Sequence, residues 1–217
     1  MFKNIVFDIG NVLFFTEWER VGRALNIRFH VDPEHAVKLF FGGGWNGRSL
    51  EHFLNLSEGT EEEFLAIAAK EFGVKLDPES FWDAWNSQWV PNVPMLSLVE
   101  RLRNLENGPR LVICSNINKR HWEYLRRTMT PLQKFHQYAL SYRVGAMKPD
   151  ERMFKECDAP PRTAVCDPRQ MFFIDDRRDN VLAARRLDWK AWEYDHGGYL
   201  EHKRLVEDYL RSQGVAI

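Results

Sequence analysis

The chain has 217 residues, with 30 basic and 31 acidic side chains and a formal net charge of −1. This near balance excludes a general nucleic-acid binder, which would need a basic surface. The length allows one good hydrophobic core and a second, smaller one. Three cysteines without zinc-binding spacing predict reduced thiols. With no N-terminal signal and no apolar run long enough to span a membrane, we expect a cytoplasmic protein.

The chain begins with a predicted strand and continues into a block of helices. The strand is Asn4–Phe7, a short apolar run typical of a buried strand. Asp-Pro pairs at 32–33 and 77–78 favour helix starts, and Thr60 with Glu63 matches a capping box. The helices predicted in this block are Trp18–Leu25, Pro33–Phe40, Leu50–Leu54, Glu61–Phe72 and Pro78–Trp89.

The rest of the chain alternates helices with strands, which predicts an α/β fold with a mostly parallel sheet. The predicted strands are Leu111–Cys114, Tyr138–Ser141, Met171–Ile174 and Lys190–Tyr194. The predicted helices are Met95–Leu105, His121–Thr128, Glu151–Cys157 and Asn180–Leu187. We therefore expect a Rossmann-like three-layer core, residues 1–15 and 91–217, and a small all-helical domain, residues 16–90.

Acidic residues follow two of the predicted strands. Asp8 ends the first strand, where ligands bind in open α/β sheets, and a carboxylate there can attack phosphorus. Asp175 and Asp176 end a later strand and would repel each other unless a cation lies between them and a third ligand. Mg²⁺ accepts such oxygen ligands. The alternatives are a helix-capping or turn aspartate at position 8 and a surface acidic turn at 175–176.

Polar residues at two other places could hold a phosphoryl group. Ser115 and Asn116 end the strand Leu111–Cys114, where a hydroxyl and backbone amides can stabilise developing charge. Lys148, before Pro149, can neutralise the phosphoryl group and the carboxylate of Asp8. The alternatives are a helix N-cap for Ser115 and an ordinary surface lysine for Lys148.

In this order the four segments resemble the signature motifs of the haloacid dehalogenase-like hydrolases, most of which are phosphatases. The resemblance covers nearly the whole chain and implies that Asp8 is the nucleophile, with Ser115 and Lys148 as phosphoryl binders. It implies a magnesium site from Asp8, the Gly10 carbonyl, Asp175, Asp176 and Asn180, in which Asp176 is the direct ligand and Asn180 holds a metal-bound water. The segments around Asp8 and Ser115 are most similar to a subgroup with sugar-phosphate phosphatases, which resembles the phosphatase domain of soluble epoxide hydrolases. The helical insert resembles the family's small cap, which closes over the site.

One position departs from the family pattern. Phosphatases of this family carry a second aspartate two residues after the nucleophile, as general acid, and here that position is Gly10. We interpret Gly10 as a residue that lets the backbone turn tightly. Water, another residue or a good leaving group would have to replace the acid. His121 and Glu17 are the candidate donors, against the alternative of ordinary packed or surface residues.

The glycine-rich stretch from Gly42 to Gly47 matches the dinucleotide fingerprint, but it follows a predicted helix rather than a strand. We interpret it as a mobile cap loop in which Trp45, Asn46 and Arg48 contact substrate. The sequence thus predicts a magnesium-dependent phosphatase of a small phosphorylated metabolite, for example a sugar phosphate, that is a monomer or homodimer and binds neither nucleic acid nor membrane. The alternatives are a metal-independent haloacid dehalogenase and a weakly active or non-catalytic phosphometabolite-binding protein.

Overall fold

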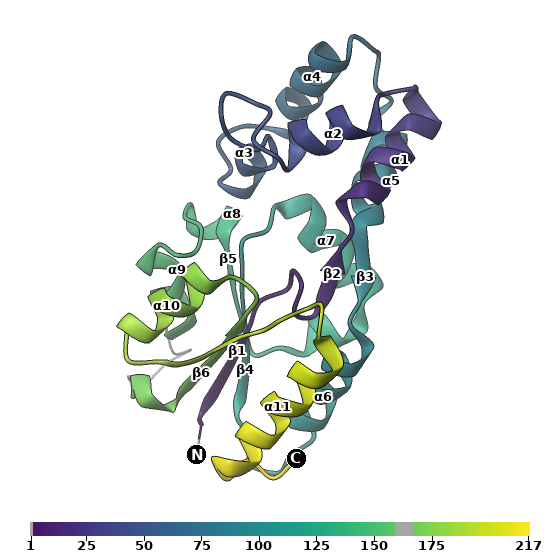
Figure 1. Cartoon of the computed structure of the whole chain (residues 1–217). Helices are drawn as coiled ribbons and strands as arrows, with labels where there is room; N and C mark the ends of the chain where they lie inside the picture. Colours follow the sequence, from purple (N-terminus) through teal and green to yellow (C-terminus); the bar gives the residue numbers. More distant parts are fainter. Residues whose placement is uncertain (1, 159–166) are drawn as a thin grey trace.

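The centre of the molecule is a parallel β-sheet. The computed structural model describes residues 2–158 and 167–217, so one of the three cysteines, Cys166, lies outside the described residues. The sheet has the strand order β5-β4-β1-β6-β7, and its neighbouring strands pair in parallel. Its strands are β1 (Asn4–Phe7), β4 (Arg110–Ser115), β5 (Gln137–Leu140), β6 (Met171–Asp175) and β7 (Lys190–Glu193) (Figure 1).

Helices cover both faces of this sheet. They are α6 (Val93–Arg103), α7 (Lys119–Thr128), α9 (Glu151–Asp158), α10 (Arg178–Arg186) and α11 (Tyr199–Ser212). Because successive strand residues point to opposite faces, Ile5 and Phe7 pack in the cluster that includes α6, α7 and α11, whereas Val6 packs with α9 and α10 (Figure 1). Cys114 and Cys157 are buried free thiols in this second cluster. The predicted three-layer α/β fold is therefore confirmed.

A second group of helices lies beyond one end of the sheet (Figure 1). We call it the cap helices: α1 (Trp18–Phe29), α2 (Pro33–Phe40), α3 (Glu51–Asn55), α4 (Glu61–Phe72) and α5 (Pro78–Trp85). They enclose a hydrophobic cluster of their own, in which Trp85 packs against Phe40, Phe64 and Phe81. The side chains of Asp32 and Asp77 cap α2 and α5, and the capping box at the start of α4 is present.

The connection between sheet and cap helices differs from our expectation. The helix predicted for Pro78–Trp89 ends at Trp85, and a 3₁₀ turn, η1 (Asn86–Gln88), leads into a strand, β3 (Trp89–Pro91). This strand pairs antiparallel with β2 (Phe14–Thr16), so the chain leaves and re-enters the core through a two-stranded ribbon. The cross-strand pairing of Phe15 with Val90 outweighs the local helical pattern. The domain boundaries at residues 16 and 90 fall in this ribbon, and the division into two domains stays a prediction.

Several short elements and one long helix were not predicted. They are α8 (Ser141–Val144), η2 (Thr130–Lys134), η3 (Pro168–Gln170) and the C-terminal α11. Helix α11 packs Val206 and Leu210 onto the same cluster as α6 and so completes one face of the sheet. Among the described helices, none combines the length and apolar character that crossing a membrane requires.

Candidate active site

Asp8 lies at the carboxyl end of β1, the central strand of the sheet. Its backbone N–H donates to the carbonyl of Ile174 on β6 at 3.0 Å, which extends the strand pairing by one residue. Its Oδ1 accepts the backbone N–H of Ile9 at 2.7 Å. The residue is only 7% exposed, so its carboxylate is held in a fixed direction with little access to solvent.

Lys148 brings a buried cation to this carboxylate. Its Nζ lies 2.9 Å from Oδ1 of Asp8 and 2.6 Å from Oδ2 of Asp175. It also donates to the carbonyl of Cys114 at 2.7 Å, so three acceptors match the three N–H donors of an ammonium. Because the side chain is buried, the alternative of an ordinary surface lysine is wrong.

The side chain of Asn116 fixes the backbone of Lys148. Its Oδ1 accepts the Lys148 N–H at 2.7 Å, and its Nδ2 donates to the Lys148 carbonyl at 3.1 Å. Both ends of the Asn116 amide therefore hold the loop that carries the lysine. The prediction that Asn116 binds substrate rests on its backbone N–H, because the side chain already has these partners.

The two carboxylates after β6 have different surroundings. Asp175 is fully buried; besides Lys148, it accepts the Arg177 backbone N–H at 2.8 Å and the Asn180 Nδ2 at 2.9 Å. Asp176 is partly buried and accepts one hydrogen bond, from Nδ2 of Asn11 at 3.0 Å. The alternative of a surface acidic turn is therefore wrong for Asp175. Asp176 has more lone pairs left for a cation, in agreement with its predicted role as the direct ligand.

Asp8, Asp175 and Asp176 together could hold a metal ion. One carboxylate oxygen from each lies within 4.8 Å of the others. Burial raises the pKa of Asp8 from 3.8 to about 7, with Lys148 opposing and the charges of Asp175 and Asp176 adding to the rise. Burial likewise raises the pKa of Asp176. A divalent cation would favour the ionised form of each of these carboxylates.

Asn180 supplies an independent sign that a group fits here. It is 1% exposed, and its Nδ2 donates to Asp175, but its Oδ1 accepts no hydrogen bond from residues 2–158 and 167–217. A buried carbonyl oxygen without a donor is uncommon in folded proteins. A water bound to a cation between the three carboxylates would supply the missing donor, which fits the predicted role of Asn180.

The electrostatics of Lys148 support the same arrangement. Burial alone would lower the pKa of its ammonium, but the charges of Asp175 and Asp8 raise it above its usual value. The lysine therefore keeps its proton and acts as a fixed positive charge.

Ser115 ends the neighbouring strand β4 and is buried. Because β4 pairs in parallel with β1, Ser115 reaches the same edge of the sheet as Asp8.

The structure corrects our reason for Gly10. Its φ is not positive; the left-handed residue in this turn is Asn11, with φ 53°. A Cβ built on Gly10 would meet nothing closer than Thr16 Cγ2, at 3.8 Å, which is an ordinary van der Waals distance. The backbone therefore does not require glycine at this position.

Both candidate acids, His121 and Glu17, already have polar partners among the described residues. His121 is fully buried, with Nε2 3.1 Å from the amide nitrogen of Gln88 and Nδ1 3.0 Å from that of Asn118. Glu51 of α3 approaches Nδ1 at 3.4 Å, and the ring stacks on Trp85. Glu17 is half exposed and pairs with Arg20 at 3.0 Å. Their role as acids stays a prediction.

Two of the three side chains predicted to bind substrate from the cap loop, Trp45 and Arg48, contact each other. The Arg48 guanidinium lies over the Trp45 ring, 5.0 Å from its centroid, and forms a two-point ion pair with Glu58. Trp45 also packs edge-on against Phe53. Residues 45 and 48 form a backbone bridge, so this loop is a tight turn rather than an open one. Contact with substrate stays a prediction.

Asn11 was missed as a site residue. Its side chain donates to Asp176, and its Oδ1 accepts both the backbone N–H of Thr16 at 3.2 Å and the Thr16 hydroxyl at 3.1 Å. It thus connects the metal-site carboxylate to β2, the strand that leads to the cap helices. An asparagine beside a glycine reads as turn chemistry, and no local signal separates this role from a turn.

No family model matches the sequence, and no curated protein matches it either. Several solved structures do match this chain in fold. A predicted HAD-like family hydrolase from Porphyromonas gingivalis has 25% identity and a TM-score of 0.74, with 95% of this chain and 98% of that chain covered. A HAD family enzyme from Bacteroides thetaiotaomicron, solved in complex with magnesium and inorganic phosphate, has 22% identity and a TM-score of 0.71, with 91% and 96% covered. The L-2-haloacid dehalogenase from Xanthobacter autotrophicus has 16% identity and a TM-score of 0.61, with 88% of this chain and 76% of that chain covered.

Fold and site therefore define a hydrolase with a Rossmann-like core and a buried carboxylate–lysine cluster at the carboxyl edge of its sheet. Its fold is similar to that of solved haloacid dehalogenase-like hydrolases, the family whose signature motifs its four segments resemble. The similarity to a dehalogenase as well as to a phosphate-bound enzyme means that the reaction has to be argued from the site.

Proposed function

We propose that this hydrolase is a magnesium-dependent phosphatase of a small phosphorylated metabolite, for example a sugar phosphate. The observation that carries the proposal is the meeting of Asp8, Asp175 and Asp176 around one point, with Asn180, whose Oδ1 has no partner among the described residues, hydrogen-bonded to Asp175. A dehalogenase reaction needs a nucleophilic carboxylate but no cation. Three acidic side chains in a buried site are better explained by a metal-assisted reaction.

In the proposed mechanism a carboxylate oxygen of Asp8 attacks phosphorus while the bond from phosphorus to the ester oxygen breaks, and the leaving group departs, taking a proton from water where it needs one. Water then hydrolyses the aspartyl phosphate, which releases phosphate and restores Asp8. Lys148 keeps its positive charge and neutralises phosphoryl oxygens, while Ser115 and backbone amides of the following loop hold them in place. Asp176, Asp8 and the Gly10 carbonyl would hold the cation, and Asn180 its water. The cation would supply charge neutralisation for the phosphoryl group and keep Asp8 ionised at neutral pH.

We further propose that the cap helices form a domain that closes over this edge of the sheet and chooses the substrate. Three contacts support a near approach of cap and core. Ser57 donates to the Tyr142 carbonyl at 2.9 Å, Arg120 pairs with Glu61, and Glu51 lies against His121.

The proposal is tested with a panel of phosphate esters and a 2-haloacid, each with magnesium and with a chelator. We expect ester hydrolysis that chelation abolishes and magnesium restores. Asp8→Asn should lose several orders of magnitude in rate, because an amide is a poor nucleophile. Release of halide that survives chelation would assign the site to the dehalogenase reaction. Binding of phosphate without turnover of any ester would favour a phosphometabolite-binding protein.

A further inference from the structure

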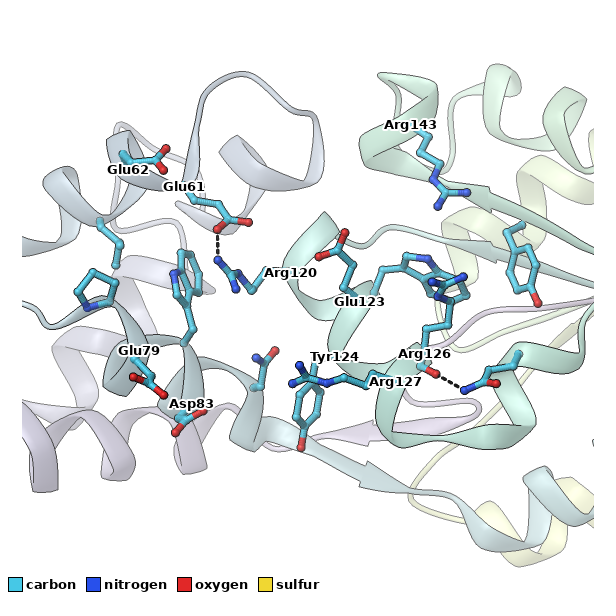
Figure 2. Close-up of a pocket in the computed structure, with 17 residues that line it drawn as sticks. Glu61, Glu62, Glu79, Asp83, Arg120, Glu123, Tyr124, Arg126, Arg127 and Arg143 are labelled. Atoms are coloured by element: carbon cyan, nitrogen blue, oxygen red, sulfur yellow. Dashed lines mark hydrogen bonds and ion pairs between the residues drawn. The ribbon is translucent and has the colours of Figure 1, made fainter.

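A large cleft lies between the cap helices and the core, away from the site described above. Its volume is about 1310 Å³, and it is lined by α4, α5 and η1 on one side and by α7 with Arg143 of α8 on the other (Figure 2). None of Asp8, Ser115, Lys148, Asp175 and Asp176 is among its lining residues. The cleft is therefore a separate feature of the boundary between cap helices and core.

Among the described residues, the cap wall of this cleft carries unpaired acidic side chains and the core wall unpaired basic ones. The core wall also carries Glu123 of α7, whose charge is paired with Lys119 at 3.8 Å. Glu62, Glu79 and Asp83 come from the cap helices, and Figure 2 shows Arg126, Arg127 and Arg143 on the core side. Within residues 2–158 and 167–217, none of these six side chains has an oppositely charged group within 4.0 Å. Six charges thus line the cleft without a direct partner, three of each sign.

An ion pair between lining residues joins the two walls. Arg120 of α7 pairs with Glu61 of α4, and its guanidinium lies over the Trp82 ring, 4.8 Å from the centroid (Figure 2). This pair shows that a guanidinium and a carboxylate from the two walls can meet.

Two lining residues of the cleft also have buried polar atoms without partners among the described residues. Asn86 is 8% exposed, yet its Oδ1 accepts no hydrogen bond from the described residues. The Nε of Arg120 is likewise buried without an acceptor. A buried acceptor and a buried donor among the residues that line one cleft call for a molecule that offers both a donor and an acceptor. Trp82 and Trp122 supply apolar surface between the walls.

We propose that this cleft binds an amphoteric small molecule, one that carries a cationic amine and an anionic carboxylate or phosphate. The amine would lie against Glu79 and Asp83, and the anion against Arg126 and Arg127. A purely anionic molecule would meet the carboxylates of the cap wall, and a purely cationic one the guanidiniums of the core wall. Only a ligand with both charges is attracted by both walls.

Such a ligand would join the cap helices to the core. Arg143 belongs to α8, where Ser141 Oγ accepts the Ile117 N–H at 2.9 Å and donates to the Ile117 carbonyl at 3.0 Å. Ile117 lies in the loop after Ser115 and Asn116. Binding in the cleft would therefore act on the position of the cap helices and on this loop, without contact with the reacting groups.

The test is calorimetric titration at low ionic strength with three probes: the dipeptide lysylglutamate, glutarate and spermidine. We expect the dipeptide to bind about tenfold more tightly than glutarate or spermidine, each of which carries charges of one sign only, because the dipeptide gains charged hydrogen bonds at both walls. Added salt should weaken the binding by screening. Glutarate or spermidine binding as tightly as the dipeptide, or no dipeptide binding at millimolar concentration, would overturn the proposal.

Variants locate the binding. Arg126→Gln with Arg127→Gln, and Glu79→Gln with Asp83→Asn, should each weaken dipeptide binding about tenfold. The matched control, Arg23→Gln with Arg28→Gln on α1, removes two exposed arginines outside the cleft lining and should leave it unchanged. Asp8→Asn should also bind normally, so the result is independent of the proposed phosphatase reaction. Equal loss in the control pair, or no loss in either cleft pair, contradicts the assignment.

Discussion

Replacing the proposed nucleophile should stabilise the metal-free protein. Asp8 has its pKa raised from 3.8 to about 7 because burial and two neighbouring carboxylates disfavour its charge more than Lys148 favours it. A rise of this size corresponds to about 4 kcal/mol against the ionised form in the folded state. Asp8→Asn removes the charge and keeps the shape. We therefore expect up to about 4 kcal/mol more stability in the variant above pH 7, without metal.

The effect has a defined pH window. Below pH 3.8 the carboxyl is neutral in both states, so the variant gains nothing. Between pH 3.8 and about 7 the unfolded chain ionises while the folded site stays protonated, and the wild type loses stability as pH rises. At pH 5 the gain from Asp8→Asn should therefore be only about 1.5 kcal/mol.

Thermal unfolding in a chelator at pH 5 and pH 8 measures this difference. For a chain of this length, about 4 kcal/mol corresponds to an increase in Tm of about 10 °C at pH 8. Magnesium should raise the Tm of the wild type more than that of the variant, because it binds the intact carboxylate cluster. Glu71→Gln, on the exposed side of α4, is the control for loss of a solvated carboxylate. A variant no more stable than wild type at pH 8 would refute this account of the site.

Three further substitutions test separate parts of the site. Lys148→Met leaves Asp8 and Asp175 buried without their cation, so it should cost about 3–5 kcal/mol in chemical unfolding of the metal-free protein and abolish turnover. Asn11→Ala should weaken magnesium binding about 10- to 100-fold in titration calorimetry, because Asp176 loses the group that orients it. Gly10→Asp should raise the rate for alkyl phosphates by about 10²- to 10⁴-fold relative to Gly10→Ala, with little change for aryl phosphates; equal rates for the two variants would contradict the missing-acid account. In the wild type, log rate should fall steeply with leaving-group pKa, and a shallow slope that steepens in His121→Ala or Glu17→Gln would identify that residue as the acid.

The parts of the fold that were predictable are those with a local physical signal. The run Ile5-Val6-Phe7 is apolar throughout because both faces of its strand are buried, and the start of α4 is marked by Thr60 and Glu63. The ribbon of β2 and β3 has no such signal. Its pairing joins residues 14–16 to 89–91, a contact between distant segments that local periodicity does not report.

The same limit applies to the site. The residue types that end strands, Asp8 and Ser115, could be placed because parallel strands present their carboxyl ends at one edge. The hydrogen bonds that hold these residues could not be predicted from the sequence. Asn116 was predicted as a substrate contact, yet its side chain fixes the Lys148 backbone, and Asn11 was read only as part of a turn. These roles depend on contacts between loops that are far apart in the sequence, Asn116 with Lys148 and Asn11 with Asp176.

Gly10 shows what the structure adds to a departure first seen in the sequence. Had its φ been positive, the absence of an acid would follow from the backbone, and Gly10→Asp would be strained. Its φ is not positive, and the space for a Cβ is open to 3.8 Å. The glycine therefore has to be explained by chemistry rather than by folding. A substrate whose leaving group departs without a proton would make an acid at this position unnecessary, because general acid catalysis helps only where the leaving group is basic. This reasoning favours anomeric, acyl or aryl phosphates over alkyl phosphates as substrates.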